Sequence, residues 1–506
     1  MRVSRPISVI FSMNSGTPST TSGQHHIIDV VRWLLIVATV VFAAAGLWIR
    51  YRFGAVLLDQ VLLNLPAIGG GTGVGSGAVA VELVGWLMAP LTLAVAVSLV
   101  LVRRGRRAGR VQGRISMRAI WLPLLAALVS LASFLSITGV PQYVYSLSDS
   151  RSIEPYYVTP AITAKPARAL NLITIYLESI EDTFSDAQLF GEDLLAPVEL
   201  ATRDWSVYRD LQQPATGGWT MAGIVATQCG MALKSDLLQA GFDPNETGER
   251  LGAYLPGAVC LGDLLGQAGY TSTFLGGASS SFAGKDTYLY SHGYQTVLGL
   301  DDWKRTGEAA QDISDWGLSD QHLFARARAV VDELHAAQRP FNLTLLTLDT
   351  HEPAVLRDSC PASGREPMAA ATRCSMQAVA GFIDHLRAAG YLADTVVIVT
   401  GDHLKGIGAG TAFYDELSQA SQRRIFFRLW SPAPVRLEVA EGDQFSVLPT
   451  TLEALGFSVA GGRAGLGMSL IGTRPVAGVA LARPPQEYAA LLSAPSRTFS
   501  ARIWAR

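Results

Sequence analysis

The stretch Gly217–Gly230, with the sequence GGWTMAGIVATQCG, carries the strongest signal for both fold and chemistry. Two glycines end a Pro-containing loop, and Trp219 and Thr220 then open a helix of small residues. Thr220 is therefore expected near a helix N-terminus, where free backbone N–H groups and the helix dipole favour an anion. Its hydroxyl is well placed to take up a phosphoryl group. The simpler interpretation is an N-cap threonine, a common role for this residue type.

Two apolar runs elsewhere favour the chemical interpretation, because each reads as a buried strand that ends in metal-binding side chains. The run 170–177 is followed by Glu178, and the run 395–400 is followed by Asp402 and His403. Two carboxylates and an imidazole suit a divalent cation such as manganese or zinc. A hydroxyl bound to such a cation becomes a nucleophile, which makes Thr220 a candidate fourth ligand.

From residue 169 onward, strand-like and helix-like runs alternate, a pattern typical of an α/β domain with a mostly parallel sheet. Ligands bind such sheets beyond the carboxyl ends of the strands, where Glu178, Asp349, His351, Asp402 and His403 are all expected. The expected helices cover residues 220–229, 261–268, 320–338, 368–389 and 444–455, and the expected strands cover 170–177, 271–275, 341–348, 395–400 and 424–430.

Three further side chains are candidates for substrate contact or catalysis. His351, at another strand end, is placed to hold a phosphate oxygen or to protonate a leaving alkoxide. Lys285 follows the Gly- and Ser-rich loop 276–281 and offers a point charge to phosphate. Trp219, beside Thr220, is a candidate substrate contact. The alternatives are a loop histidine and a surface lysine.

Charge and cysteine usage restrict the class of protein. The 506-residue chain has a net charge of −2, so no global basic field indicates a nucleic-acid partner. Its four cysteines all follow the last apolar segment and form no CxxC motif, which favours two disulfides in an oxidising compartment. Cys360 and Cys374 flank a short Pro- and Gly-containing segment, so we expect them to pair. Cys229 and Cys260 then pair by elimination.

The excess of apolar residues lies in the first 140 positions and predicts membrane spans at about residues 33–49, 83–102 and 119–140. Residues 54–68 are apolar but interrupted, which favours a loop or a re-entrant or interfacial helix and not a full span. Seven arginines between 103 and 118 favour a cytoplasmic loop under the positive-inside rule, so the chain after residue 141 is expected outside the cytoplasm.

This topology divides the chain into five expected regions. Residues 1–28 form a disordered cytoplasmic N-terminus, 29–140 the membrane region, 141–168 a linker, 169–475 the catalytic domain and 476–506 a C-terminal extension. The topology predicts a multi-pass anchor with an exported catalytic domain, and the family resemblance given next implies that the membrane is a bacterial inner membrane and that the domain is periplasmic.

The motifs together resemble those of the phosphoglycerol transferase I family, the membrane enzymes that decorate osmoregulated periplasmic glucans. The wider group contains lipoteichoic acid synthases and sulfatase-like hydrolases of the alkaline phosphatase superfamily. The resemblance covers roughly residues 165–475. It rests on NLITIYLES (171–179), GGWTMAGIVATQCG (217–230), FLGGAS (274–279), FAGK (282–285), LDTHEP (348–353), DHL (402–404) and GLGMSL (465–470).

The resemblance implies a mechanism and a set of ligands. Thr220 attacks the phosphate of phosphatidylglycerol and releases diacylglycerol, and a glucan hydroxyl then attacks the phosphoglycerol-threonine. The implied metal ligands are Glu178, Thr220, Asp402 and His403, with Mn²⁺ as the first candidate and Mg²⁺ or Zn²⁺ as alternatives. His351 takes the phosphate-side role.

Two other functions remain open at this stage. The first is a phosphoethanolamine transferase, or a hydrolase of phospholipids or sulfate esters, on the same scaffold. A formylglycine sulfatase is disfavoured, because CPASGR (360–365) has the wrong spacing for the Cys-x-Pro-x-Arg motif. The second is an inactive membrane protein that binds glucan or lipid, and the presence of Thr220 with all three other ligands argues against it.

Overall fold

The structure is a computed structural model that describes residues 20–54, 56, 58, 76–107, 118–234, 252–314, 316–356, 360, 367–475 and 478–505. The chain separates into two compact units. The first contains residues 1–47 and 83–134, and the second contains residues 48–82 and 135–506.

The described part of the first unit consists of long apolar helices, α1 (Thr20–Phe53), α3 (Ser76–Arg107) and α4 (Arg118–Ile137), without their ends at 48–53, 76–82 and 135–137, which belong to the second unit. Within them, Ile28–Phe53, Val81–Val100 and Ile120–Ile137 are long and apolar enough to cross a membrane, and at most 11% of any of these windows is buried. Such exposed apolar surface fits a membrane anchor. The three predicted spans coincide with these helices.

The helix bounds differ from the sequence expectation at two points. Helix α1 begins at Thr20, inside the segment expected to be disordered. The third helix ends at Ile137, because Gly139 takes a left-handed conformation (φ 73°) and starts the separate helix α5 (Val140–Ser146). Most of 54–68 and of the arginine-rich loop lies outside the described residues.

A seven-stranded sheet forms the centre of the second unit, with the order β3-β9-β8-β2-β7-β5-β6. The five strands from β8 to β6 are parallel, and β9 and β3 continue the sheet in antiparallel pairing. The prediction of a mostly parallel α/β sheet is confirmed. The strands are β2 (Asn171–Leu177), β3 (Ser206–Val207), β5 (Thr271–Gly276), β6 (Thr296–Leu298), β7 (Phe341–Leu346), β8 (Thr395–Gly401) and β9 (Phe427–Trp430).

The three central strands are buried along their whole length, as expected for continuous apolar runs covered on both faces. Their register aligns the strand ends. Leu177 pairs with Gly401, and Tyr176 pairs with Leu346. The chain therefore leaves β2, β7 and β8 at one edge of the sheet, and this edge holds the candidate site.

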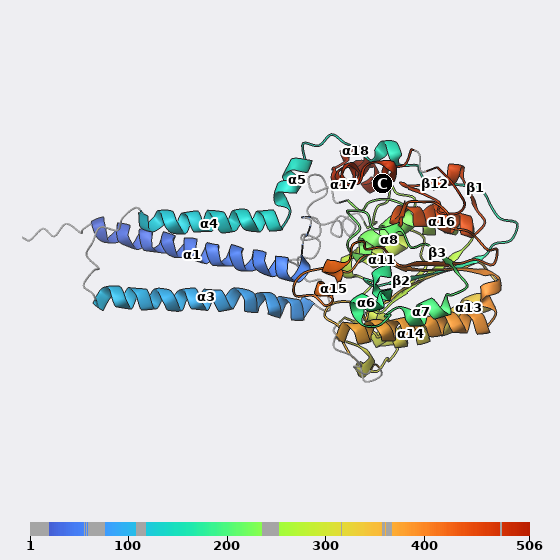
Figure 1. Cartoon of the computed structure of the whole chain (residues 1–506), viewed down its shortest axis with the longest axis horizontal. Helices are drawn as coiled ribbons and strands as arrows, with labels where there is room; N and C mark the ends of the chain where they lie inside the picture. Colours follow the sequence, from blue (N-terminus) through green and yellow to red (C-terminus); the bar gives the residue numbers. More distant parts are fainter. Residues whose placement is uncertain are drawn as a thin grey trace, which may run out of the picture. The chain divides into compact units, whose positions relative to one another are not determined.

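Helices cover both faces of this sheet (Figure 1). One face packs against α7 (Ala196–Ala201), α13 (Asp320–Ala336) and α14 (Pro367–Ala388). On the other side lie α8 (Thr220–Cys229), α10 (Leu261–Gln267), α11 (Lys285–Ser291) and α16 (Val447–Ala454). Short strand pairs form away from the main sheet: β1 (Ile162–Ala164) with β11 (Ser458–Val459), β4 (Leu211–Gln212) with β10 (Gly442–Asp443), and β12 (Arg463–Ala464) with β13 (Gly467–Met468).

The segment after residue 475 is helical and packs into the same unit. Helices α17 (Pro485–Ser493) and α18 (Arg497–Trp504) bury Leu492, Phe499 and Ile503 in the cluster that also surrounds α8. The Tyr488 hydroxyl donates a hydrogen bond to the buried carboxylate of Asp443. These helices thus contribute to the hydrophobic core behind the helix that carries Thr220.

Both predicted disulfides are confirmed. Cys360 pairs with Cys374 across a sequence separation of 14, and Cys229 pairs with Cys260 across 31. Cys229 is the last residue of α8, and Cys260 is the N-cap of α10. The second bond therefore ties the helix of Thr220 to its neighbour.

Candidate functional site

Glu178, Asp402 and His403 converge where β2 and β8 end. Each offers one ligand atom, and these atoms all lie within 4.8 Å of one another. All three residues are buried. The cluster follows from the register of the two parallel strands, since Glu178 is the first residue after β2 and Asp402 the first after β8.

The buried carboxylate of Asp402 has one satisfied oxygen and one unsatisfied oxygen. Its Oδ1 accepts hydrogen bonds from the backbone N–H groups of Ser179 at 2.8 Å and His403 at 2.7 Å. Its Oδ2 is buried without a hydrogen-bond partner among the described residues. A buried carboxylate oxygen without a donor is costly unless a cation binds it. This oxygen therefore fits a metal ion.

The imidazole of His403 has the matching orientation. Its Nδ1 lies 2.9 Å from the carbonyl oxygen of Leu404, to which it donates. That tautomer leaves Nε2 as a ligand atom, 3.4 Å from Glu178 Oε1 and 3.6 Å from Asp402 Oδ2. A hydrogen bond to the backbone from the second ring nitrogen is common for metal-binding histidines.

The pKa values of these three groups reflect their crowding. Burial, and then the charge of Glu178, raise the pKa of Asp402 to about 8. Burial opposes the charge of His403, but the two carboxylates outweigh it and raise the pKa of the imidazole to about 9. Burial likewise opposes ionisation of Glu178, yet its contacts with His403 lower its pKa. A divalent cation would neutralise these charges and release the protons.

Thr220 joins this cluster from α8. The N-cap of the helix is Trp219, and Thr220 is its first helical residue. The Thr220 hydroxyl donates to Glu178 Oε2 at 3.1 Å, so its side chain points to the carboxylates and does not cap the helix. The hydroxyl lies beside the first-turn N–H groups, which favour an anion.

Helix α8 approaches the end of β8 as closely as backbone atoms allow. A Cβ at Gly223 would lie 1.9 Å from the carbonyl oxygen of Asp402. Gln444 Nε2 donates to the same oxygen at 2.6 Å. The glycine therefore sets the distance between the Thr220 helix and Asp402.

We expect Gly223→Ala to lower stability and activity together. Alanine is favoured over glycine inside a helix by ~1 kcal/mol, but the clash is with backbone atoms and overpacking costs about 1–3 kcal/mol. Gly266→Ala in α10 is the matched control, because a Cβ there meets nothing within 4 Å. Thermal unfolding of the purified proteins should show a lower midpoint for Gly223→Ala and an equal or higher one for Gly266→Ala. The reverse order would contradict the packing described here.

His351 lies near the same cluster. Its Nδ1 donates to the carbonyl oxygen of Glu352 at 2.9 Å, and its ring packs on Trp316 at 4.1 Å between centroids. Burial lowers the pKa of His351, while the charge of Glu178 acts in the opposite direction. The hydrogen bond to Glu352 uses Nδ1, so Nε2 is the ring nitrogen that could contact a ligand.

Lys285 is buried at the first turn of α11. Burial lowers the pKa of its ammonium, and the nearby charges of Glu178 and Asp402 oppose this shift. Within the described residues the ammonium has no hydrogen-bond partner. Trp219 is half-buried against the core around α8. The structure therefore places every candidate from the sequence at or near one edge of the sheet.

Several residues that hold this site were not singled out from the sequence. Thr347 Oγ1 accepts from the N–H of Glu178 at 2.8 Å, and Thr350 Oγ1 donates to its carbonyl oxygen at 2.6 Å. Asp320 accepts from the N–H groups of Leu348 at 2.7 Å and Asp349 at 3.2 Å. Thr347 directly precedes the LDTHEP segment (348–353) and Thr350 lies inside it, which is a usable signal. Asp320 begins a helix and gives no local sign of this role.

A second group of potential metal ligands contains Cys260, Asp263 and His292. Cys260 is in a disulfide and cannot bind a metal as a thiolate. Both ring nitrogens of His292 already contact protein groups, Asp263 at 2.7 Å and the carbonyl oxygen of Tyr254 at 2.9 Å. This group therefore stabilises the fold.

Comparison with known proteins places this arrangement in a family context. The chain is 35% identical over 263 residues to phosphoglycerol transferase I of Xanthomonas euvesicatoria pv. vesicatoria (strain 85-10), covering 51% of this chain and 36% of the relative. It is 31% identical over 324 residues to phosphoglycerol transferase I of Escherichia coli (strain 55989 / EAEC), covering 62% and 41%. The chain thus spans about two fifths of the length of these curated relatives.

Among solved structures, it resembles an alkaline phosphatase superfamily protein from Vibrio parahaemolyticus, with a TM-score of 0.48, 19% identity and coverage of 67% of this chain and 78% of the other. It also resembles the lipoteichoic acid synthase LtaP from Listeria monocytogenes, with a TM-score of 0.48, 17% identity and coverage of 65% and 81%. The Sulfatase family model matches residues 200–457, just over half of the sequence. Because this match covers just over half of the sequence, the chain belongs to the sulfatase family.

Proposed function

We propose that this protein is a membrane-anchored phosphoglycerol transferase that moves phosphoglycerol from phosphatidylglycerol to a periplasmic glucan. The observation that carries the proposal is the Thr220 hydroxyl, 3.1 Å from Glu178 Oε2 at the start of α8 and inside a buried carboxylate–imidazole cluster. The curated relatives that carry the name phosphoglycerol transferase I support the choice of transferred group.

Glu178, Thr220, Asp402 and His403 would hold one divalent metal ion, with Mn²⁺ as the first candidate and Mg²⁺ or Zn²⁺ as alternatives. Such an ion supplies positive charge that lowers the pKa of the hydroxyl and offsets the charge of the phosphate. The donor set of two carboxylates, an imidazole and a hydroxyl suits it, as does the unsatisfied Oδ2 of Asp402.

The chain's own residues then divide the reaction between them. In the first half, the Thr220 hydroxyl loses its proton to solvent, Oγ1 forms a bond to phosphorus, and the bond from phosphorus to the diacylglycerol oxygen breaks. The N–H groups that begin α8 face the phosphate, and Lys285 adds a buried positive charge. His351 protonates the leaving alkoxide, and a bound phosphate anion would oppose the lowering of its pKa by burial.

In the second half, a glucan hydroxyl attacks phosphorus, the bond from phosphorus to Thr220 Oγ1 breaks, and Oγ1 takes up a proton from solvent. His351 takes the proton of the attacking hydroxyl, which restores its starting state. Trp219, the N-cap residue of α8, would contact the incoming substrate.

The three apolar helices fit a membrane anchor. We further propose a multi-pass topology in a bacterial inner membrane, with residues 169–475 as the periplasmic catalytic domain. The arginine-rich segment 103–118 supports this orientation, because such loops stay in the cytoplasm. The anchor would keep the site beside its lipid donor.

Intact-mass and peptide mass spectrometry after incubation with phosphatidylglycerol vesicles tests the proposal. We expect a phosphoglycerol adduct on Thr220, release of diacylglycerol, and loss of the adduct when glucan is added. Phosphatidylethanolamine vesicles are the parallel arm. A phosphoethanolamine adduct from those vesicles, with none from phosphatidylglycerol, would replace this proposal with a phosphoethanolamine transferase. Lipid turnover without any adduct on Thr220 would refute the covalent step.

A further inference from the structure

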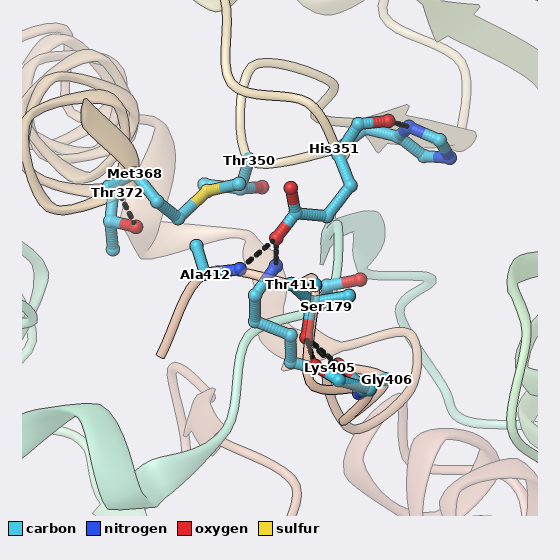
Figure 2. A network of polar contacts seen from close by, with 12 residues as sticks. Ser179, Thr350, His351, Met368, Thr372, Lys405, Gly406, Thr411 and Ala412 are labelled. Carbon is cyan, nitrogen blue, oxygen red and sulfur yellow. Dashed lines mark hydrogen bonds and ion pairs between the residues drawn. The ribbon is translucent and has the colours of Figure 1, made fainter. Parts of the chain in front are cut away.

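The loop 404–412, which follows directly from Asp402 and His403, is tied to the residue beside His351. Lys405 Nζ lies 2.7 Å from Glu352 Oε1, and the N–H of Ala412 donates to the same oxygen at 2.9 Å. Figure 2 shows Lys405 and Ala412 converging on this carboxylate beside the Thr350–His351 segment. Both ends of the loop therefore bind Glu352.

Glu352 in turn fixes the conformation of its neighbour. Its carbonyl oxygen accepts from His351 Nδ1 at 2.9 Å. On the other side of the histidine, Thr350 Oγ1 donates to the carbonyl oxygen of Glu178 at 2.6 Å. The segment around His351 is thus held on one side by Glu178 and on the other by loop 404–412, which follows Asp402 and His403. The Lys405 side chain is only 2% exposed, so its pairing with Glu352 is not a loose surface contact.

The middle of the same loop contacts the last turn of α1, which belongs to the second unit. The N–H of Gly410 donates to the carbonyl oxygen of Tyr51 at 2.9 Å. Arg52 Nη1 donates to the carbonyl oxygen of Gly410 at 3.4 Å. Burial opposes ionisation of Glu352, but the charge and hydrogen bond of Lys405, then the N–H of Ala412 and the charge of Arg52, lower its pKa.

Glycines on both sides make this contact possible. A Cβ at Gly408 would lie 2.4 Å from the carbonyl oxygen of Tyr51, and a Cβ at Gly54 would lie 2.0 Å from the carbonyl oxygen of Ile407. Gly54 also has a φ of +72°. Because both clashes are with backbone atoms, no side-chain rotation relieves them. The backbones of loop 404–412 and of the end of α1 therefore lie so close together that only glycine fits at positions 54 and 408.

We propose that the last turn of α1 is a positioning element of the site: it seats loop 404–412, and through Lys405 and Ala412 that loop fixes Glu352 and hence His351. The proposal rests on the proposed function for the role of His351. The last turn of α1 continues directly from the predicted membrane span 33–49, so the proposal links the end of a membrane helix to catalysis. Loss of the contact leaves Thr220 and the metal ligands in place and misplaces the acid.

Alanine variants of the full-length protein in lipid nanodiscs test this. Gly408→Ala and Gly54→Ala break the contact from opposite sides. Gly406→Ala is the control for the first, because a Cβ there meets nothing within 4 Å. Gly191→Ala is the control for the second, because it combines a φ of +78° with open space. The measurement is the single-turnover rate constant for the Thr220 adduct, which does not depend on the folded fraction.

Two donors separate positioning from general damage. Phosphatidylglycerol has a leaving alkoxide that needs a proton, whereas the p-nitrophenyl ester of glycerol phosphate has a leaving group that does not. We expect Gly408→Ala and Gly54→Ala to slow adduct formation from the lipid by ~10- to 100-fold and to leave the nitrophenyl ester nearly unaffected, as His351→Ala should. Metal content should match wild type, and both controls should behave as wild type.

Hydrogen exchange of segments 348–353 and 404–412 provides a readout that is independent of activity. Faster exchange in both segments is expected for the two contact variants and for neither control. Unchanged exchange, or equal slowing with both donors, would overturn the proposal. If wild type forms no adduct from either donor, the proposed function fails, and the exchange data alone then decide whether α1 holds the His351 segment.

Discussion

Thr220→Ala should abolish diacylglycerol release from phosphatidylglycerol, with a loss on the order of 10⁴-fold or more in kcat. The substitution removes the atom that would bond to phosphorus. Among the described residues, no other hydroxyl donates to Glu178 Oε2. The helix should survive, because its N-cap is Trp219 and alanine is a strong helix former. The measurement is lipid turnover in vesicles, together with thermal unfolding.

The companion variants separate nucleophile from scaffold. Thr220→Ser keeps the hydroxyl and should keep part of the turnover. Thr227→Ala is the matched control on the same helix, where the hydroxyl bonds to Tyr176 and to the backbone of Gly223, within the core and away from the cluster. It should cost stability but leave adduct formation intact. Diacylglycerol release by Thr220→Ala at a rate close to wild type would make the threonine a structural residue and end the proposed mechanism.

The sequence was sufficient to predict that the candidate site residues lie close together, because their proximity depends on a general property of parallel sheets. Glu178, Asp402 and His351 each follow an apolar run, and in a parallel sheet such runs all end at one edge. Helix α8 was also predictable in its bounds, since Thr220 follows two glycines and Gly230 provides a left-handed C-cap.

Other features of the sheet had no local signal. Strand β9 was expected to begin at residue 424, but its pairing begins at Phe427 and is antiparallel to β8. Strands β3 and β6 are two and three residues long, too short for a periodic pattern. Their pairing is decided by neighbouring strands that are distant in sequence.

The contacts that orient the site were also beyond sequence reasoning. Which oxygen of Asp402 is satisfied depends on the local turn after β8. The contact between Tyr51 and Gly410 joins residues more than 350 positions apart, and only the glycines of the loop hint at a close approach. Such contacts depend on tertiary packing and cannot be read from one chain without its fold.

The second large effect concerns the proposed metal ligands, and it has opposite signs for activity and for stability. Asp402→Asn should abolish turnover and metal binding, because the ligand oxygen Oδ2 is replaced by an amide group. The same change should raise the stability of the metal-free protein, on the order of 1–2 kcal/mol. Burial and the neighbouring Glu178 disfavour the Asp402 carboxylate, as its raised pKa shows. An asparagine can keep the acceptor for Ser179 and His403 and donate to Glu178.

Unfolding measurements during titration with Mn²⁺, after chelation of any bound metal, give both the stability of the metal-free protein and its stabilisation by the metal. Wild type should gain ~2.7 kcal/mol at a free metal concentration of 100 times Kd, whereas Asp402→Asn, Glu178→Gln and His403→Ala should gain little. His351→Ala is the matched control, since it lies beside the cluster but contributes no ligand atom, and its stabilisation by Mn²⁺ should equal that of wild type. Equal stabilisation of Asp402→Asn and wild type would show that the cation binds elsewhere, and the unsatisfied oxygen of Asp402 would then need a different partner.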